Sequence, residues 1–300
     1  MCNVESRRAA RTLAAGVALA LGRRAFPLLA FGIALLPLPA ASQQKPPEKS
    51  GEIWPAAVQA RYRLRYNGIE VGKVDLKLNT SGNTYSISGS GKVSVLFGSV
   101  VWAASSTVSG TIEDGEPLPA NYAFDWRNNK KRGTIRISYL DHIAAQIAVR
   151  PPTRERRDTV PLRQGDKVAL DPVSAIMMLT KADARPPCDR RVGIFDGKQR
   201  YDIVFTPKRL TRLPAPRGGG SEVAYVCRIT YEPISGHRAN ADTKEYAANR
   251  DVELVLRRIP HSQMLIPYSL SVPTPWGTGT MVTERIDISS ATAGKIALTD

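Results

Sequence analysis

Residues 171–181, DPVSAIMMLTK, are the one stretch of this chain with a helical hydrophobic pattern, and we expect the rest of the fold to be arranged around them. Asp171 is suited to the N-cap, and Pro172 fits the first helical position. The apolar spacing i, i+3, i+4, i+7 is met by Val173, Ile176, Met177 and Thr180. This pattern predicts a short helix with one apolar stripe.

Two cysteines follow this helix, Cys188 and Cys227, and the latter lies on the apolar side of an alternating run. In an oxidising compartment such a pair forms a disulfide, which with about forty residues in its loop contributes roughly 4 kcal/mol. The alternative is a pair of buried free thiols. We therefore expect helix and disulfide to clamp an otherwise all-β protein.

The first 42 residues have the order of a secretory signal peptide: five arginines, an apolar run over 26–38, then small residues. Arg23-Arg24 also fits the twin-arginine export signal, although Pro27 interrupts it. The apolar run is too short to span a membrane comfortably, so a retained anchor is the less favoured alternative. We expect a cleaved signal, which also removes Cys2, and a periplasmic location.

The chain is strongly basic. Its net charge of +15 becomes +11 without residues 1–42, because these hold five arginines and one glutamate. In an exported protein the accessible polyanions are envelope lipids and polymers, and nucleic acid is not expected. An ordinary solvated basic surface is an equally good explanation.

From residue 57 onward the pattern is β-type. Asn67-Gly68, between two alternating runs, is a strong hairpin signal, and a change of apolar phase predicts a bulge at Gly72-Lys73. Gly89 and Gly91 occupy apolar-phase positions, which suits a sharply curled strand. Further turns are expected at 81–83, 113–115, 128–129, 141–142 and 196–197, separated by alternating runs.

Three segments are harder to assign. Residues 96–104 are apolar in both phases, so we expect a buried strand there, with an exposed binding lip containing Phe97 and Trp102 as the alternative. Residues 150–167 predict a long charged loop, and residues 207–220 a loop rich in proline, glycine and arginine. Residues 239–250 have room for a helical turn without an apolar stripe.

About a dozen antiparallel strands exceed what an open twisted sheet tolerates without curling. The predicted fold is therefore mainly β: a single large curved antiparallel sheet, either a closed barrel or a half-barrel, with one short helix packed on it. The expected organisation is a signal peptide (1–42), a flexible leader (43–56), one β domain (57–289) and a C-terminal tail (290–300).

No familiar catalytic or metal-binding motif occurs in the sequence, and we expect neither an enzyme, nor a cofactor, nor a metal site. His142, His237 and His261 are isolated from one another. Asp171 is better explained as a helix cap than as a catalytic acid. A hydrolase would need a carboxylate such as Asp202 or Glu253 beside an arginine in a pocket.

Clustered cations are the candidate binding residues. They lie in one predicted loop and at one hairpin tip, and arginines so placed can bind phosphate or carboxylate. The candidates are Arg150, Arg154, Arg156, Arg157, Arg163, Lys130, Lys131 and Arg132, with Lys167 nearby. Solvated loops that protect the sheet edges are the alternative.

Several short motifs follow one another along the chain: Tyr62-x-Leu64, Gly68-Ile69-x-Val71-Gly72, Tyr85-x-Ile87-x-Gly89, Asp171-Pro172-x-Ser174-Ala175, Cys188, Gly197-x-x-Arg200-Tyr201-Asp202, Cys227 and Tyr231-x-Pro233-x-x-Gly236. In this order they resemble an exported proteobacterial family catalogued as domain of unknown function 3108. The resemblance covers most of residues 57–289. It implies a periplasmic, mainly β protein with no established activity, and no catalytic residues transfer.

The sequence thus predicts a non-enzymatic envelope protein that binds an amphipathic or anionic component, either a lipid or a glycan. The alternative is a structural or assembly partner that acts through its loops and has a filled interior. Cavity volume distinguishes them, because a ligand carrier needs several hundred cubic ångströms of apolar space.

Overall fold

The computed structural model describes residues 54–95, 100–154, 156–182, 186–215, 220–259, 262–290 and 294–299. The strands of the first half are β1 (Ala57–Tyr66), β2 (Ile69–Ser81), β3 (Thr84–Val95), β4 (Val100–Glu113), β5 (Glu116–Asn128), β6 (Arg132–Leu140) and β7 (Ile143–Arg150). Those of the second half are β8 (Arg190–Phe195), β9 (Arg200–Pro214), β10 (Ser221–Ser235), β11 (Glu253–Arg258), β12 (Leu265–Thr274), β13 (Gly277–Ser290) and β14 (Gly294–Thr299). The helices are α1 (Pro172–Thr180) and α2 (Ala241–Ala248), with a 3-10 turn at Gln164–Lys167.

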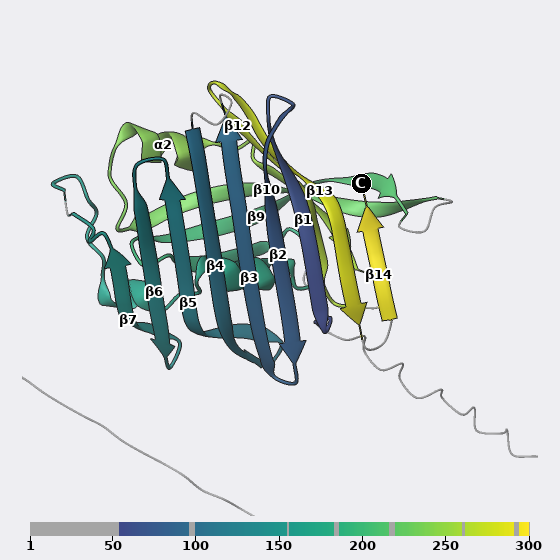
Figure 1. The fold of residues 1–300 in the computed structure, drawn as a ribbon, viewed down its shortest axis with the longest axis horizontal. Helices are drawn as coiled ribbons and strands as arrows, with labels where there is room; N and C mark the ends of the chain where they lie inside the picture. The colour runs from purple at the N-terminus through teal and green to yellow at the C-terminus, as the bar shows by residue number, and fades with distance from the viewer. Residues whose placement is uncertain are drawn as a thin grey trace, which may run out of the picture. The chain divides into compact units, whose positions relative to one another are not determined.

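All these strands form one antiparallel sheet of 14 strands, which confirms the predicted fold class. The strand order is β7-β6-β5-β4-β3-β2-β1-β13-β12-β11-β10-β9-β8, and β14 pairs with β13. Because β7 and β8 end this order without pairing, the sheet is open, and of the two predicted forms the closed barrel is wrong. Figure 1 shows β1–β7, β13 and β14 as one wall, with β9 and β10 crossing behind it.

The turns between consecutive strands are short because their residues accept positive φ. Asn67 and Gly68 have φ of 49° and 82° and join β1 to β2 as a two-residue loop. The bulge in β2 lies one residue earlier than predicted, since Leu64 pairs with Gly72 and Arg65 with Glu70, which leaves Val71 unpaired. A side chain on Gly72 would overlap the Lys92 carbonyl oxygen, so this position requires glycine.

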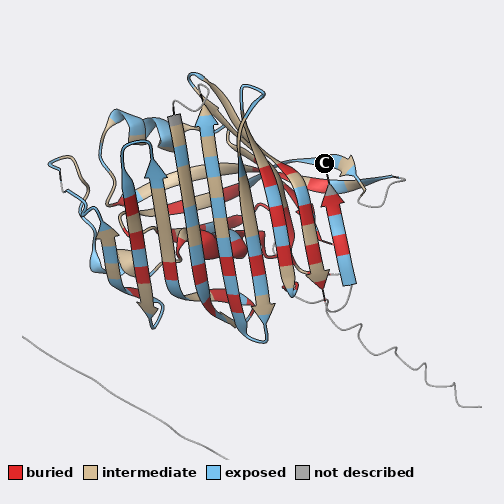
Figure 2. Ribbon diagram, viewed as in Figure 1, coloured by how far each residue is buried: buried red, intermediate tan, exposed pale blue. Residues whose placement is uncertain are grey.

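Helix α1 lies between the two parts of the sheet. Its Val173 and Met177 belong to the apolar core of the wall, together with Tyr62 and Ile137. Its Ala175 and Leu179 belong to a second core against β8–β12. Figure 2 shows α1 as mostly buried behind the wall. The helix is therefore apolar on two sides, and the predicted single stripe is wrong at Ile176, which is 44% exposed.

Local interactions fix both ends of this helical segment. The Asp171 carboxylate accepts hydrogen bonds from the Val173 and Ser174 amides at 2.9 and 3.0 Å, which confirms the predicted N-cap. After the helix, Cys188 forms a disulfide with Cys227 of β10, as predicted. The helix and the disulfide that the sequence predicts as a clamp are therefore both present.

Two central segments differ from the prediction. Residues 207–214 belong to β9, in which Pro207 pairs with Cys227 beside a bulge, a position where strands tolerate proline. Within the apolar segment 96–104, residues 96–99, including Phe97, lie outside the described residues. Trp102 in β4 is 40% exposed, so the predicted burial is wrong there.

The predicted boundaries of the β domain are too narrow at both ends. Trp54 and Pro55, assigned to the flexible leader, are buried, and Trp54 packs in the wall core. The expected tail at 290–300 contains β14, whose Ile296 and Leu298 are buried on β13. The structure also contains a second helix, α2, in the segment that suggested only a helical turn. The signal peptide at 1–42 lies outside the described residues.

Candidate functional site

The interior between α1 and the wall is nearly filled. Its apolar cavity has a volume of about 70 Å³ and is lined by side chains such as Tyr62, Leu78, Met177 and Ile266. A lipid carrier needs several hundred cubic ångströms of such space. Two larger hollows, of about 640 and 580 Å³, lie on the outer face of the sheet, which therefore has more room for a ligand than the interior.

Four cations stand in register across the outer face of the wall. Lys73 of β2 pairs with Lys92 of β3, which is opposite Ala103 of β4. Ala103 is opposite Arg127 of β5, and Arg127 is opposite Arg132 of β6. We call Lys73, Lys92, Arg127 and Arg132 the basic row. All four side chains are exposed.

The basic row borders an open cavity of about 640 Å³, which we call the trough. Its floor is made by small residues, Ser90, Ala103 and Ser105, between long basic side chains, and this difference in length creates the hollow. The trough also contains Asp75 and Asp125. Asp75 is paired with Arg61 at 2.8 Å, and Asp125 with Arg136 at 2.8 Å, so cations outside the row neutralise both acids.

The basic row is electrostatically unfavourable for the fold by itself. Lys73–Lys92 and Arg127–Arg132 are like charges directly opposite each other on adjacent strands, an arrangement that destabilises a sheet. Glu284 relieves part of this repulsion by pairing with Lys73 at 3.0 Å. An anion bound in the trough would reduce the remaining repulsion between the cations and would contact several of them at once.

Half of the cations predicted from the sequence lie beside this row. Arg132 is a member of it, and Lys130 and Lys131 form the adjoining β5–β6 turn. Arg150 of β7 is opposite Thr134 and lines, with Arg132, a neighbouring cavity of about 580 Å³. The two cavities share three lining residues, so they are continuous on the outer face.

The other predicted cations, Arg154, Arg156, Arg157 and Arg163, are exposed along the connection from β7 to α1. The Arg156 amide donates to Thr159 Oγ1 at 3.2 Å, and the Arg163 amide to Asp166 Oδ2 at 2.7 Å. None of the contacts described for these four residues joins them to the basic row. The predicted cluster is therefore divided in two.

Sequence reasoning missed Lys73, Lys92 and Arg127. These residues are separated along the chain and form no charge run, so no local pattern identifies them. The signal that finds Lys73 and Lys92 is the register of the turn at 81–84, which sets the two residues opposite each other. In the same way, the register set by the β5–β6 turn places Arg127 opposite Arg132.

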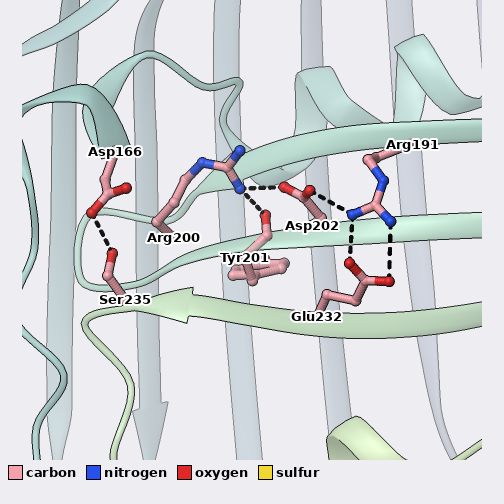
Figure 3. Close-up of polar contacts among 7 residues, drawn as sticks. All are labelled: Asp166, Arg191, Arg200, Tyr201, Asp202, Glu232 and Ser235. Carbon is pink, nitrogen blue, oxygen red and sulfur yellow. Dashed lines mark hydrogen bonds and ion pairs between the residues drawn. The ribbon is translucent and has the colours of Figure 1, made fainter.

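The carboxylate that a hydrolase would need, Asp202, lies in a closed ion-pair network (Figure 3). Arg191 bonds Asp202 at 2.9 Å and both Glu232 carboxylate oxygens, while Arg200 bonds Asp202 at 2.5 Å. Burial alone would raise the pKa of Asp202, but the hydrogen bonds from Arg200 and Arg191 hold it below its ordinary value. Asp202 is therefore ionised and engaged, which does not suit a proton donor.

Glu253 is engaged in the same way. Lys208 and Arg209 pair with its carboxylate at 2.5 and 3.0 Å. The Lys208 hydrogen bond, more than any other contact, lowers the pKa of Glu253. His142 lies in the β6–β7 turn, and His261 is outside the described residues. No group of three or more potential metal ligands occurs among the residues that the structure describes.

A buried polar cluster surrounds the N-terminus of α1. The Tyr85 hydroxyl and Ser174 Oγ are 2.7 Å apart, and Asp171 Oδ2 and the Tyr139 hydroxyl are buried without a described hydrogen-bond partner. Burial raises the pKa of Tyr85, Tyr122 and Tyr139, and also that of Asp171. These groups are enclosed in the core, where they connect the helix to the wall.

None of the described helices is long and apolar enough to cross a membrane. Among solved structures, the chain is similar to the crystal structure of a β-barrel-like protein of domain of unknown function DUF1849 from Brucella abortus. The TM-score is 0.52 at 12% identity, and the match covers 79% of this chain and 100% of that chain. This likeness concerns the fold alone.

No curated protein matches the sequence. The family model described as "Protein of unknown function (DUF3108)" matches residues 61–284, from β1 into β13, which confirms the resemblance seen in the sequence motifs. This chain belongs to the DUF3108 family.

Proposed function

We propose that this protein is an exported, non-enzymatic protein of the periplasm that binds an anionic, phosphate-bearing component of the cell envelope on the outer face of its sheet. The observation that carries the proposal is the basic row, in which four exposed cations in register border an open trough. Phosphate oxygens can accept hydrogen bonds from several of these side chains together. The signal-like residues 1–42 and the strongly basic charge support the compartment and the sign of the ligand.

The nearly filled interior supports a binding surface rather than an enclosed carrier. With about 70 Å³ of apolar space beside α1, an acyl chain has no room inside unless the helix moves. A bound lipid or glycan would therefore present its anionic group to the outer face.

Inorganic tripolyphosphate is a suitable probe, because it offers clustered phosphates without an acyl chain or a sugar. Calorimetric titration at low and high salt should show binding that weakens as salt rises. The double variant Lys92→Ala/Arg127→Ala should bind at least about tenfold more weakly. A control variant with the same loss of charge, Lys295→Ala/Lys244→Ala, should bind like the unaltered protein. Equal binding by both double variants would refute a role for the basic row.

The second candidate is a structural or assembly partner that acts through its loops, which the filled interior also favours. In that case tripolyphosphate should not bind at all, and a protein partner should be retained by the chain whether or not the basic row is intact. Retention of one defined partner by the unaltered protein and by Lys92→Ala/Arg127→Ala alike would favour this candidate.

A further inference from the structure

Two hairpin turns far apart in sequence lie side by side at one end of the wall (Figure 1). They are the β1–β2 turn at Asn67 and the β12–β13 turn that contains Trp276. The Asn67 amide donates to the Thr278 carbonyl at 3.0 Å, and the Thr278 amide donates to Asn67 Oδ1 at 2.8 Å. Asn67 Nδ2 also donates to the Trp276 carbonyl at 3.4 Å. The two turns are thus joined into one tip.

This tip exposes apolar side chains. Trp276 is 80% exposed, Ile69 is 71% exposed and Tyr66 is 37% exposed. Turn residues are usually small or polar, so two large apolar side chains in contact with water at adjoining turns are unusual. Tryptophan and tyrosine favour the boundary between water and acyl chains, where the ring is buried and the polar edge stays hydrated.

The basic row lies at the same end of the wall as this tip. Lys73 is four residues beyond Ile69 along β2, a distance of about 13 Å at the usual rise of a strand. The β5–β6 turn with Lys130 and Lys131 also points to this end (Figure 1). Two acids on this side are matched by cations: Glu284 pairs with Lys73, and Glu70 lies opposite Arg65. None of the described ion pairs joins Lys92, Arg127 or Arg132 to an acid. An apolar tip is therefore followed by a belt of excess positive charge.

We propose that this end of the protein docks on an anionic lipid bilayer. Trp276, Ile69 and Tyr66 enter the boundary between headgroups and acyl chains, and the basic row binds lipid phosphates. A tip that penetrates roughly 5–10 Å leaves the basic row within reach of the phosphates, because lysine and arginine side chains extend toward them. The excess positive charge identifies the occupant as an anionic lipid surface. An apolar tip without these cations would not distinguish an anionic surface from a neutral one. This inference rests on the proposed function, since it uses the same basic row, and it names the ligand as a lipid headgroup.

Co-sedimentation with vesicles tests the docking. The unaltered protein should bind vesicles of phosphatidylglycerol and phosphatidylcholine and should bind pure phosphatidylcholine at least about tenfold more weakly. Trp276→Ser/Ile69→Ser should lower binding to the anionic vesicles at least about tenfold. Leu140→Ser is the control for loss of an exposed apolar side chain elsewhere, because Leu140 is 66% exposed at the β6–β7 turn, at the opposite end of β6 from Arg132. Any contribution of residues 1–42 is common to all variants.

Tripolyphosphate binding separates the two proposals. Trp276→Ser/Ile69→Ser should bind tripolyphosphate like the unaltered protein, because the basic row is intact. If the unaltered protein binds tripolyphosphate but not anionic vesicles, or if the tip variant and Leu140→Ser bind vesicles equally, docking is overturned and the proposed function stands. If the unaltered protein binds neither tripolyphosphate nor anionic vesicles, both the docking and the proposed function are overturned.

Discussion

Replacing Arg127 by glutamate should stabilise the fold and at the same time weaken anion binding. In the native sheet Arg127 faces Arg132 across adjacent strands on the outer surface. The substitution replaces this repulsion by an attraction. Asp125, two residues away on the same face, is already paired with Arg136, so it opposes the new carboxylate only weakly.

The size of the effect follows from Coulomb's law. Two unit charges about 6 Å apart in water interact by about 0.7 kcal/mol, so a change of sign is worth about 1.4 kcal/mol without salt. At physiological ionic strength the Debye length of about 8 Å roughly halves this value, and ordering of the two side chains reduces it further. We therefore expect Arg127→Glu to raise the free energy of unfolding by about 0.5 kcal/mol.

Urea unfolding and tripolyphosphate titration of the same preparations measure the two effects. Binding should fall at least about tenfold, because the row loses one cation and gains an anion. Lys295→Glu, the same charge change on the exposed side of β14, should leave binding unchanged and alter stability by only a few tenths of a kcal/mol. A loss of stability above about 1 kcal/mol, or unchanged binding, would refute the reasoning about the basic row.

Three further predictions concern the clamp and the core. Cys188→Ser removes the disulfide to Cys227, which spans a sequence separation of 39. It should lower the free energy of unfolding by about 4 kcal/mol in urea without reductant and by little with reductant. Equal stability of the two proteins without reductant would rule out a stabilising bridge. Met177→Ala should cost about 2–5 kcal/mol, because Met177 is 2% exposed between α1 and the wall; a cost below about 1 kcal/mol would show that the interior is not closely packed. Asp171→Ala should cost about 1–2 kcal/mol through loss of the helix cap, whereas Asp171→Asn keeps a cap acceptor and should be at least as stable as the unaltered chain near about pH 7.

The pH dependence of the Asp171 variants follows from burial. Burial raises the pKa of Asp171, so the folded chain keeps this proton to higher pH than the unfolded chain does. The protonated Asp171 side chain therefore makes its full contribution to stability below the unfolded pKa of about 3.9. This contribution is lost as the pH rises through the raised pKa of the folded chain, where the buried side chain ionises. Any advantage of Asp171→Asn should therefore shrink as the pH is lowered toward about 3 in thermal unfolding. An advantage that grows on acidification would contradict this assignment.

Local patterns predicted the strands, most turns and the helix. Asn67-Gly68 set the first hairpin, and Asp171-Pro172 set the start of α1, because each depends on residues that are adjacent in sequence. Pro207 was misassigned to a loop because its tolerance in β9 depends on a bulge opposite Cys227. The predicted stripe of α1 was right at Val173 and Met177 and wrong at Ile176. The second buried side of α1, at Ala175 and Leu179, was missed because its partners lie in β8–β12 and leave no signal in the helix itself.

The candidate site was only partly predictable because it is made by register across five strands. Lys130, Lys131 and Arg132 are consecutive and therefore visible in the sequence. Lys92 and Arg127 are brought together through Ala103, and the β4–β5 register on this side depends on a bulge at Ser109/Gly110. Without that bulge the pairing of β4 with β5 would shift by one residue. A shift of one residue would place the Arg127 side chain on the other face of the sheet.

Amide hydrogen exchange with and without anionic phosphatidylglycerol vesicles tests the central claim, that binding takes place on the outer face and tip. The account predicts added protection in the segments around 66–73, 92–95, 127–132 and 274–278, with α1 unchanged. Protection confined to α1 and to the cavity residues near Tyr62 and Ile266 would place the ligand inside the sheet and contradict the account.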